Sequence, residues 1–275
     1  MAALLRSGGG ETPSGWTENF DDSIEGIKSR GWAIEDSESP DRKFGIPGYR
    51  ENNHVGVYQE DHVSLVEGAN NNKYLRLLLT QESGPVDENP NGVISRGALL
   101  YSINKYGYGT YEWRMRLSST NPNPEDPFFG SSTSGSVSAG FIYVNNSETE
   151  IDFEFAGHVV EDENTQNGES LYMVNWNNQD PSSNPRGNES TFHVVSVVGL
   201  NREFHIYKFV WEKNGITFYV DGVPQLIHRT NVPSAPAHFM INHWGTNRPG
   251  GFGGTATVAV ERYFYVDWVK YTPPR

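Results

Sequence analysis

Short runs of alternating apolar and polar residues recur along the chain, and clusters of glycine, asparagine, proline and aspartate separate them. Residues 107–117 have this alternation, which is typical of half-buried β-strands. Residues 74–80 are also predicted as a strand, and residues 139–144 lead toward another strand near residue 150. Residues 263–271 are expected to form the last strand. Helical periodicity is scarce, so the pattern predicts an all-β chain.

The clearest hairpin lies between residues 204 and 228. Phe204 to Trp211 is predicted as one strand and Ile216 to Val220 as its partner, with a turn at Asn214-Gly215. Asp221-Gly222 then turns the chain again. Both dipeptides tolerate the positive φ values that two-residue hairpin loops require.

The chain of 275 residues fits one large all-β domain, and no repeat or strong linker divides it. Residues 1–12 are predicted to be a flexible N-terminal segment, and residues 13–275 a single domain. Residues 34–53, 119–137 and 177–190 are polar and rich in turn-forming residues, so they are expected to be long loops that could form the walls of a cleft.

Composition narrows the range of partners. The formal net charge is −13, so the basic surface that nucleic acid or an anionic membrane would attract is not expected. There is no cysteine, which excludes disulfides and a thiol nucleophile. The apolar run at residues 1–6 is too short for a signal-peptide core. We expect a secreted monomer whose export signal has been removed.

One predicted strand has acidic residues at alternate positions, in the order Glu-Ile-Asp-Phe-Glu-Phe from residue 150. Glu150, Asp152 and Glu154 should share one face and the apolar residues the other, in a core. The solvated outer face of an ordinary strand would look the same. The alternative is a glycosidase site, in which one carboxylate attacks and another stays protonated. Asp152 could then raise the proton affinity of Glu154.

The segment 150–154 resembles the Glu-x-Asp-x-Glu signature of glycoside hydrolase family 16, in the form found in bacterial lichenases and xyloglucan transglycosylases. The likeness extends over about residues 74–272. Further segments resemble family motifs in the same order, namely 105–112, 204–207, 216–222, 240–245 and 266–269. Several ordered matches make the resemblance specific, whereas the acidic strand alone would not.

The resemblance implies an all-β, concanavalin A-like β-jelly-roll sandwich with a concave substrate cleft. It implies Glu150 as nucleophile, Glu154 as general acid/base and Asp152 as a supporting carboxylate, with a glycosyl-enzyme intermediate. The expected function is a retaining endo-β-glucanase acting on β-1,3-1,4-glucan. A β-1,3-glucanase, a xyloglucan-type transglycosylase and a non-catalytic, lectin-like glycan-binding domain are the alternatives.

Four further residues match family positions that hold the sugar, and Phe141, on the strand before the acidic one, is expected to line the cleft. Amides bind sugar hydroxyls and aromatic faces stack on pyranose rings. The candidates for substrate binding are Arg96, Phe141, Asn175, Asn242 and Trp244.

Trp176 and His243 are expected to point away from the cleft because they flank two of these candidates. The chain departs from lichenases at Glu148 and Asn177, where tryptophan and tyrosine are usual, and this weakens the inference about substrate.

The eight histidines form no zinc-binding spacing, so no catalytic cofactor is expected. A structural Ca²⁺ is a separate possibility. Asp267 matches a family position whose oxygen helps to bind calcium, and the carbonyl of Gly68 is a possible partner, since calcium prefers hard oxygen ligands.

Overall fold

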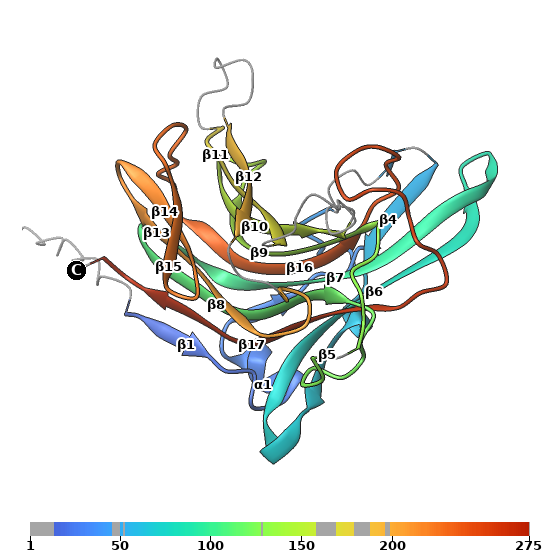
Figure 1. Cartoon of the computed structure of the whole chain (residues 1–275), viewed down its shortest axis with the longest axis horizontal. Coiled ribbons are helices and arrows are strands. Elements are labelled where there is room, and N and C mark those ends of the chain that lie inside the picture. The colour runs from blue at the N-terminus through green and yellow to red at the C-terminus, as the bar shows by residue number, and fades with distance from the viewer. Residues whose placement is uncertain are drawn as a thin grey trace, which may run out of the picture.

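The computed structural model describes residues 14–45, 50–51, 53–127, 129–157, 169–178, 188–195 and 199–274. Within them the chain forms seventeen strands, one short α-helix and two 3-10 turns (Figure 1). The elements are β1 (Trp16–Glu18), α1 (Ile24–Ser29), β2 (Trp32–Ile34), β3 (Arg50–Glu51), β4 (His54–Tyr58), η1 (Glu60–His62), β5 (Val63–Glu67), η2 (Ala69–Asn71), β6 (Lys73–Val86), β7 (Asn89–Tyr106), β8 (Gly109–Ser119), β9 (Ser136–Val144), β10 (Thr149–Ala156), β11 (Glu169–Trp176), β12 (Asn188–Val195), β13 (His205–Glu212), β14 (Gly215–Val220), β15 (Val223–His228), β16 (Ala237–Gly245) and β17 (Arg262–Thr272).

The strands form two sheets that pack face to face. Sheet A runs β15-β14-β13-β8-β17-β6-β5, with β1 beside the end of β17. Sheet B runs β12-β11-β10-β9-β16-β7-β2. In Figure 1, β7, β16 and β9 of sheet B lie above β8 and β17 of sheet A. The predicted all-β jelly-roll sandwich is confirmed.

The long strands β6 and β7, of 14 and 18 residues, connect the two layers. They pair with each other near their shared turn, and further along β6 joins sheet A while β7 joins sheet B. The pairing of β4 with β7 is parallel, and the other strand pairs of the described residues are antiparallel. The sheets therefore form one continuous hydrogen-bonded network.

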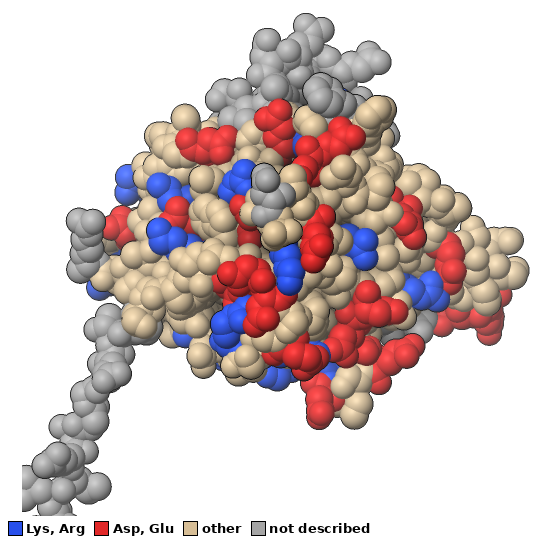
Figure 2. All heavy atoms as spheres, turned by 90° about the horizontal axis from the view of Figure 1, so that it is seen from below, with Lys and Arg blue, Asp and Glu red and all other residues tan. Residues whose placement is uncertain are grey.

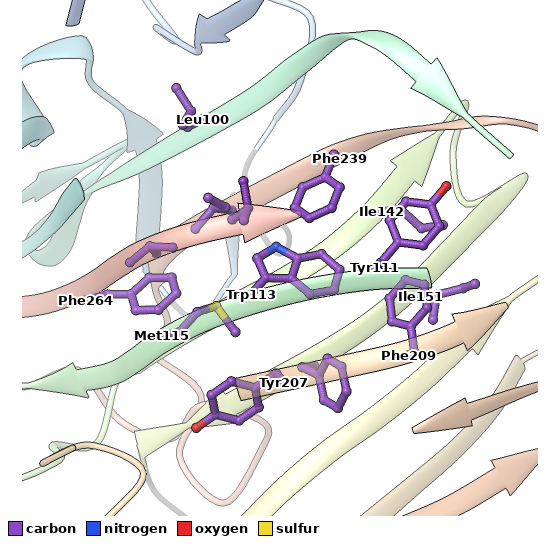
Figure 3. Packing of buried hydrophobic residues seen from close by; sticks show 14 of the residues in the cluster. Leu100, Tyr111, Trp113, Met115, Ile142, Ile151, Tyr207, Phe209, Phe239 and Phe264 are labelled. Atoms are coloured by element: carbon purple, nitrogen blue, oxygen red, sulfur yellow. The ribbon is translucent and has the colours of Figure 1, made fainter. Parts of the chain in front are cut away.

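A core rich in aromatic side chains fills the space between the sheets (Figure 3). Trp113 on β8 is fully buried, and its ring lies 4.4 Å from that of Phe239 on β16. Phe153 on β10 packs against Trp113 and Phe209 at 6.3 and 6.2 Å. Buried aromatic rings contribute large apolar areas, so these contacts fix how sheet B lies on sheet A.

Turn chemistry explains the hairpins of sheet A. Asp221 and Gly222 have φ values of 50° and 78°, so the predicted Asp-Gly turn between β14 and β15 is confirmed. The preceding turn differs by one residue from the prediction. Gly215 already pairs with Glu212, which leaves Lys213 and Asn214 as the two loop residues.

The alternation pattern missed some elements. Strand β7 begins in the polar, glycine-containing segment 89–97, where a period of two is hard to detect. Helix α1 is too short to show helical periodicity, and the Ser23 hydroxyl caps it by accepting from the Gly26 amide. Strand β12 starts inside the predicted loop 177–190. Residues 1–12 lie outside the described part, so the domain division stays a prediction.

The surface of the described residues mixes charges of both signs on the face that Figure 2 shows. Lysine and arginine side chains are interspersed there with aspartate and glutamate, without one continuous basic area among the residues described on that face. None of the helices described is long and apolar enough to cross a membrane.

Replacing Phe153 with alanine tests how far this core holds the strand in place. The Phe153 side chain is 1% exposed, so truncation should lower the free energy of unfolding by about 3–5 kcal/mol. Val223→Ala is the control, because Val223 is 50% exposed and should change it by under about 0.5 kcal/mol. Urea denaturation followed by tryptophan fluorescence measures both. Equal effects of the two substitutions would contradict this description of the core.

Candidate active site

The three acidic residues of β10 lie on one face of sheet B, as alternation predicts. Ile151, Phe153 and Phe155 point to the other face and belong to the core between the sheets. Glu150, Asp152 and Glu154 therefore lie on the face that turns away from sheet A. We call this the carboxylate face of sheet B.

Strands β9 and β11 border the acids, and the register fixes which side chains lie beside each one. Directly paired residues on neighbouring strands point to the same face. The cross-strand rows are Tyr143–Glu150–Trp176, Phe141–Asp152–Val174 and Ala139–Glu154–Tyr172. Aromatic side chains therefore lie beside every acid, while a methyl group lies on one side of Glu154.

A second apolar cluster covers much of the carboxylate face. Its buried members are Tyr58, Leu99, Tyr101, Val137, Ala139, Phe141, Ala156, Met240 and Trp244, and Ala33, Phe44, Tyr143, Tyr172 and Phe252 pack against them. The rings of Phe44 and Tyr101 are 4.9 Å apart, and those of Tyr172 and Phe252 are 5.0 Å apart. Asp152 is thus buried among apolar groups, while Glu150 and Glu154 beside it are half-buried.

This burial favours the neutral forms of all three acids, because a charged carboxylate loses hydration there. Loss of hydration raises the pKa of Glu150 to about 7, against an opposing hydrogen bond from Ser147. Burial and then the charge of Glu150 raise the pKa of Glu154 to about 8. Asp152 is only 3% exposed, and burial with both glutamates raises its pKa well above the ordinary value.

Asp152 was expected to raise the proton affinity of Glu154, and the two carboxyl groups do interact, since the charge of Glu154 raises the pKa of Asp152 and that of Glu150 raises the pKa of Glu154. A buried Asp152 that keeps its own proton brings no charge to its neighbours. One face thus combines carboxyl groups that hold protons near neutral pH. Such a set can both donate a proton and supply a carboxylate, as acid/base catalysis requires.

Comparisons with known proteins agree with this geometry. Residues 51–270 match the family model described as glycosyl hydrolases family 16. The chain belongs to this family. The resemblance that the sequence motifs indicated is therefore confirmed.

Two curated relatives and one solved structure illustrate the likeness. A beta-glucanase of Paenibacillus polymyxa is 31% identical over 175 residues, or 62% of this chain and 62% of that protein. The endo-1,3-1,4-beta-glycanase ExoK of Rhizobium meliloti is 27% identical over 264 residues, covering 93% and 79%. A β-1,3-1,4-glucanase (lichenase) from a mouse hindgut metagenome has a TM-score of 0.64 at 21% identity, covering 95% of this chain and 100% of that one.

The matched part thus spans less than two thirds of the Paenibacillus relative's own length. The solved structure supports the fold alone.

Two predicted orientations on β11 are wrong in this family 16 protein. Asn175 pairs with Ile151, so it points to the core, where it is fully buried. Its amide donates to the carbonyls of Thr230 and Asn231 at 3.0 and 2.8 Å. Trp176 pairs with Glu150 and lies on the carboxylate face, half buried. A sugar beside the acids would meet Trp176 and not Asn175.

Arg96 is also not brought to the acids. Leu99 lies on the carboxylate face, so alternation directs Arg96 and Ala98 to the other side of β7. The Arg96 guanidinium pairs there with Glu82 at 2.5 Å. The predicted contact with substrate is therefore not supported by its position.

The remaining binding candidates do lie on the carboxylate face. Phe141 is opposite Asp152 and is 8% exposed. Asn242 and Trp244 on β16 are 5% and 3% exposed, and the Trp244 ring lies 6.1 Å from that of Phe252. His243 between them points into the core, as expected, where it bonds to Leu77 and Ser118. The sugar contacts of the three candidates stay predictions.

The residues proposed for calcium do not fit a cation. The Asp267 carboxylate is paired with the Arg114 guanidinium, which would repel Ca²⁺. Gly68 adjoins Glu125, but that carboxylate accepts from the Ala69 amide and the Tyr74 hydroxyl. The described residues contain no group of three potential His, Asp or Glu ligands. We derive no role for calcium from this arrangement.

Sequence reasoning overlooked the buried Glu35 and the aromatic residues around the acids. Glu35 is 2% exposed and accepts hydrogen bonds from the amides of Lys43 and Phe44 at 2.8 and 3.1 Å. This carboxylate fixes the loop after β2 so that Phe44 covers Tyr101. The sequence gives a weak signal of this arrangement, because Phe44 is an aromatic residue in a polar segment that is otherwise typical of a loop.

The raised pKa values make folding stability depend on pH. The pKa of Glu154 is about 8 in the folded chain and 4.5 ordinarily, so its contribution is complete below about pH 4.5 and is lost as pH rises through 8. Glu154→Gln cannot ionise. Thermal and urea unfolding at pH 8.5 should therefore show the variant more stable than the wild type by about 1–3 kcal/mol, and less so at pH 5.

Glu203→Gln is the matched control, because Glu203 is exposed. Its effect should be the same at both pH values. A wild-type protein whose stability rises steadily from pH 5 to 8.5 relative to Glu154→Gln would contradict the buried, proton-holding site.

Proposed function

We propose that this protein is a retaining endo-β-glucanase that hydrolyses β-1,3-1,4-glucan. The observation that carries the proposal is one strand face with three carboxyl groups, whose proton affinities are raised by burial. Membership of family 16 supports a glycosidase, and the name of the ExoK relative supports the mixed-linkage substrate.

In the proposed mechanism Glu150 attacks the anomeric carbon and Glu154 protonates the departing oxygen. Burial raises the pKa values of both groups toward neutrality, so either can hold a proton there. Water would then attack the glycosyl-enzyme, with Glu154 acting as base, so the sugar configuration is retained.

Asp152 is proposed as the supporting carboxyl group between the two. Cα atoms four residues apart on a strand are separated by about 13 Å, so the glutamate side chains must lean together over the middle residue. A neutral Asp152 can donate a hydrogen bond to an ionised Glu150. Such a bond would hold the nucleophile in place without adding a second negative charge.

The flanking rings are proposed to hold a polymer across the acids. Tyr143 and Trp176 lie beside Glu150, and Tyr172 with Phe252 lies beside Glu154. Aromatic contacts on both sides of the cleavage point suit a chain that continues in both directions, as an endo-acting enzyme requires. A cleft that holds this chain is part of the proposal.

Secretion and a monomeric state are proposed on physical grounds. A polymeric glucan does not enter a cell, so an enzyme that cleaves it internally works outside. The three acids come from one strand of one chain, so a second copy is not needed to complete the site.

Reducing-end release from barley mixed-linkage glucan, laminarin and xyloglucan tests the proposed activity. The wild type should act best on the mixed-linkage glucan, while Glu150→Gln and Glu154→Gln should each lose at least about 10³-fold in kcat. Glu148→Gln, a neighbouring acid hydrogen-bonded to Asn145, is the control and should keep most activity.

Preference for laminarin would indicate a β-1,3-glucanase, and transfer to xyloglucan oligosaccharides a transglycosylase. Binding without turnover on any of these glycans would favour a lectin-like domain. Full activity of either glutamine variant on an unactivated polysaccharide would reject the assigned carboxyl groups.

A further inference from the structure

An incompletely paired amide lies on the carboxylate face. Asn242 is 5% exposed, and its Nδ2 donates to the Tyr58 hydroxyl at 3.2 Å. Its Oδ1 is buried and has no hydrogen-bond partner among the described residues. A buried acceptor without a donor costs about 1–3 kcal/mol, so such an atom calls for an explanation.

The sheet register directs this amide toward Glu154. Glu154 pairs with Ala139, and Ala139 pairs with Asn242 on the next strand. The three residues form one row across β10, β9 and β16, with Cα atoms of the outer two about 10 Å apart. Because Ala139 in the middle has only a methyl group, no side chain of that row separates the amide from the carboxyl.

Tyr58 on β4 holds the amide from above the sheet. Its hydroxyl is buried with the apolar cluster of this face and accepts the Asn242 Nδ2. Burial chiefly raises the pKa of Tyr58, and the charges of Glu35 and Glu154 raise it further. Both carboxyl groups are thus close enough to interact with this hydroxyl.

Several other titratable groups face Glu154. On its own strand these are Glu150 and Asp152, and on β11 it is Tyr172, whose pKa Glu154 raises. β9 contributes Ala139 at this row, and β4 contributes Tyr58. None of these groups is a cation, so a protonated Glu154 can use its hydroxyl as a donor without competition from a salt bridge.

We propose that Asn242 Oδ1 accepts a hydrogen bond from the protonated carboxyl of Glu154, and that Tyr58 is the positioning residue that holds the amide beside it through Nδ2. This rests on the proposed function, in which Glu154 is the acid. The bond is available only to the neutral carboxyl. It therefore stabilises the protonated form, so that Glu154 keeps its proton at neutral pH.

The opposite rotation of the Asn242 amide would have the opposite effect on the proton affinity of Glu154. With the amide turned by half a rotation, Nδ2 would face Glu154 and would favour the ionised carboxylate instead. The structure has Nδ2 on the Tyr58 hydroxyl, but a phenol hydroxyl can also donate to Oδ1, so the tyrosine alone does not fix the rotation of the amide. The direction of a pH shift thus distinguishes them.

The pH dependence of kcat/KM on mixed-linkage glucan tests the proposal. Asn242→Leu, close in shape to asparagine, and Tyr58→Phe should each move the alkaline limb to lower pH, by about 0.5–1 unit. The double variant should shift no further than Asn242→Leu alone, because both changes act through one bond. Thermal unfolding identifies variants that are folded at the assay temperature.

Tyr101→Phe is the matched control. Tyr101 lies on the same face and pairs with Met240, and Glu35, not Glu154, is the charge that raises its pKa besides burial. The alkaline limb of the kcat/KM profile of Tyr101→Phe should lie at the same pH as that of the wild type. An unmoved limb in both Tyr58→Phe and Asn242→Leu, or a limb moved to higher pH, would overturn the proposal.

Failure of the proposed function would look different. In that case Glu154→Gln would keep its activity, whatever the tyrosine and asparagine variants do. If only the inference fails, Glu154→Gln is inactive and the wild-type profile has an alkaline limb that neither Tyr58 nor Asn242 affects.

Discussion

The alternation of side chains along β10 is the constraint on which the rest of the molecule depends. Phe153 and its apolar neighbours must enter the core, so the acids must take the other face. Each requirement enforces the other. A register slip of one residue would place three carboxyl groups in the core, which the loss of hydration would prohibit.

The acidic site lowers the stability of the folded chain, and the packing of the core compensates for this loss. Keeping carboxyl groups among aromatic side chains raises their proton affinities and makes the folded chain less stable as they ionise. The packing of Trp113, Phe239 and Phe153 between the sheets offsets that cost. An apolar carboxylate face is therefore a means of tuning the acids, and in the proposed function the rings beside them contact the sugar.

The sequence predicted the class of fold and the shared face of the acids, because alternation is a local property. It did not predict which residues of β11 share the face of the acids. Whether Asn175 or Trp176 faces the acids depends on the register with β10, and a long connection separates the two strands. Family likeness favoured Asn175, while the pairing with Ile151 directs it to the core. The Arg114–Asp267 pair was equally hidden, since it joins residues 153 positions apart.

Direct titration of the side-chain carboxyl carbons by ¹³C NMR, with assignments from the Glu150→Gln, Asp152→Asn and Glu154→Gln variants, tests the central claim most directly. We expect the resonances of Glu150 and Glu154 to titrate near pH 7 and 8, and that of Asp152 far above its ordinary value. If all three carboxyl groups titrate near pH 4, as exposed ones do, the face is solvated and its acids hold no protons at neutral pH, which contradicts the claim.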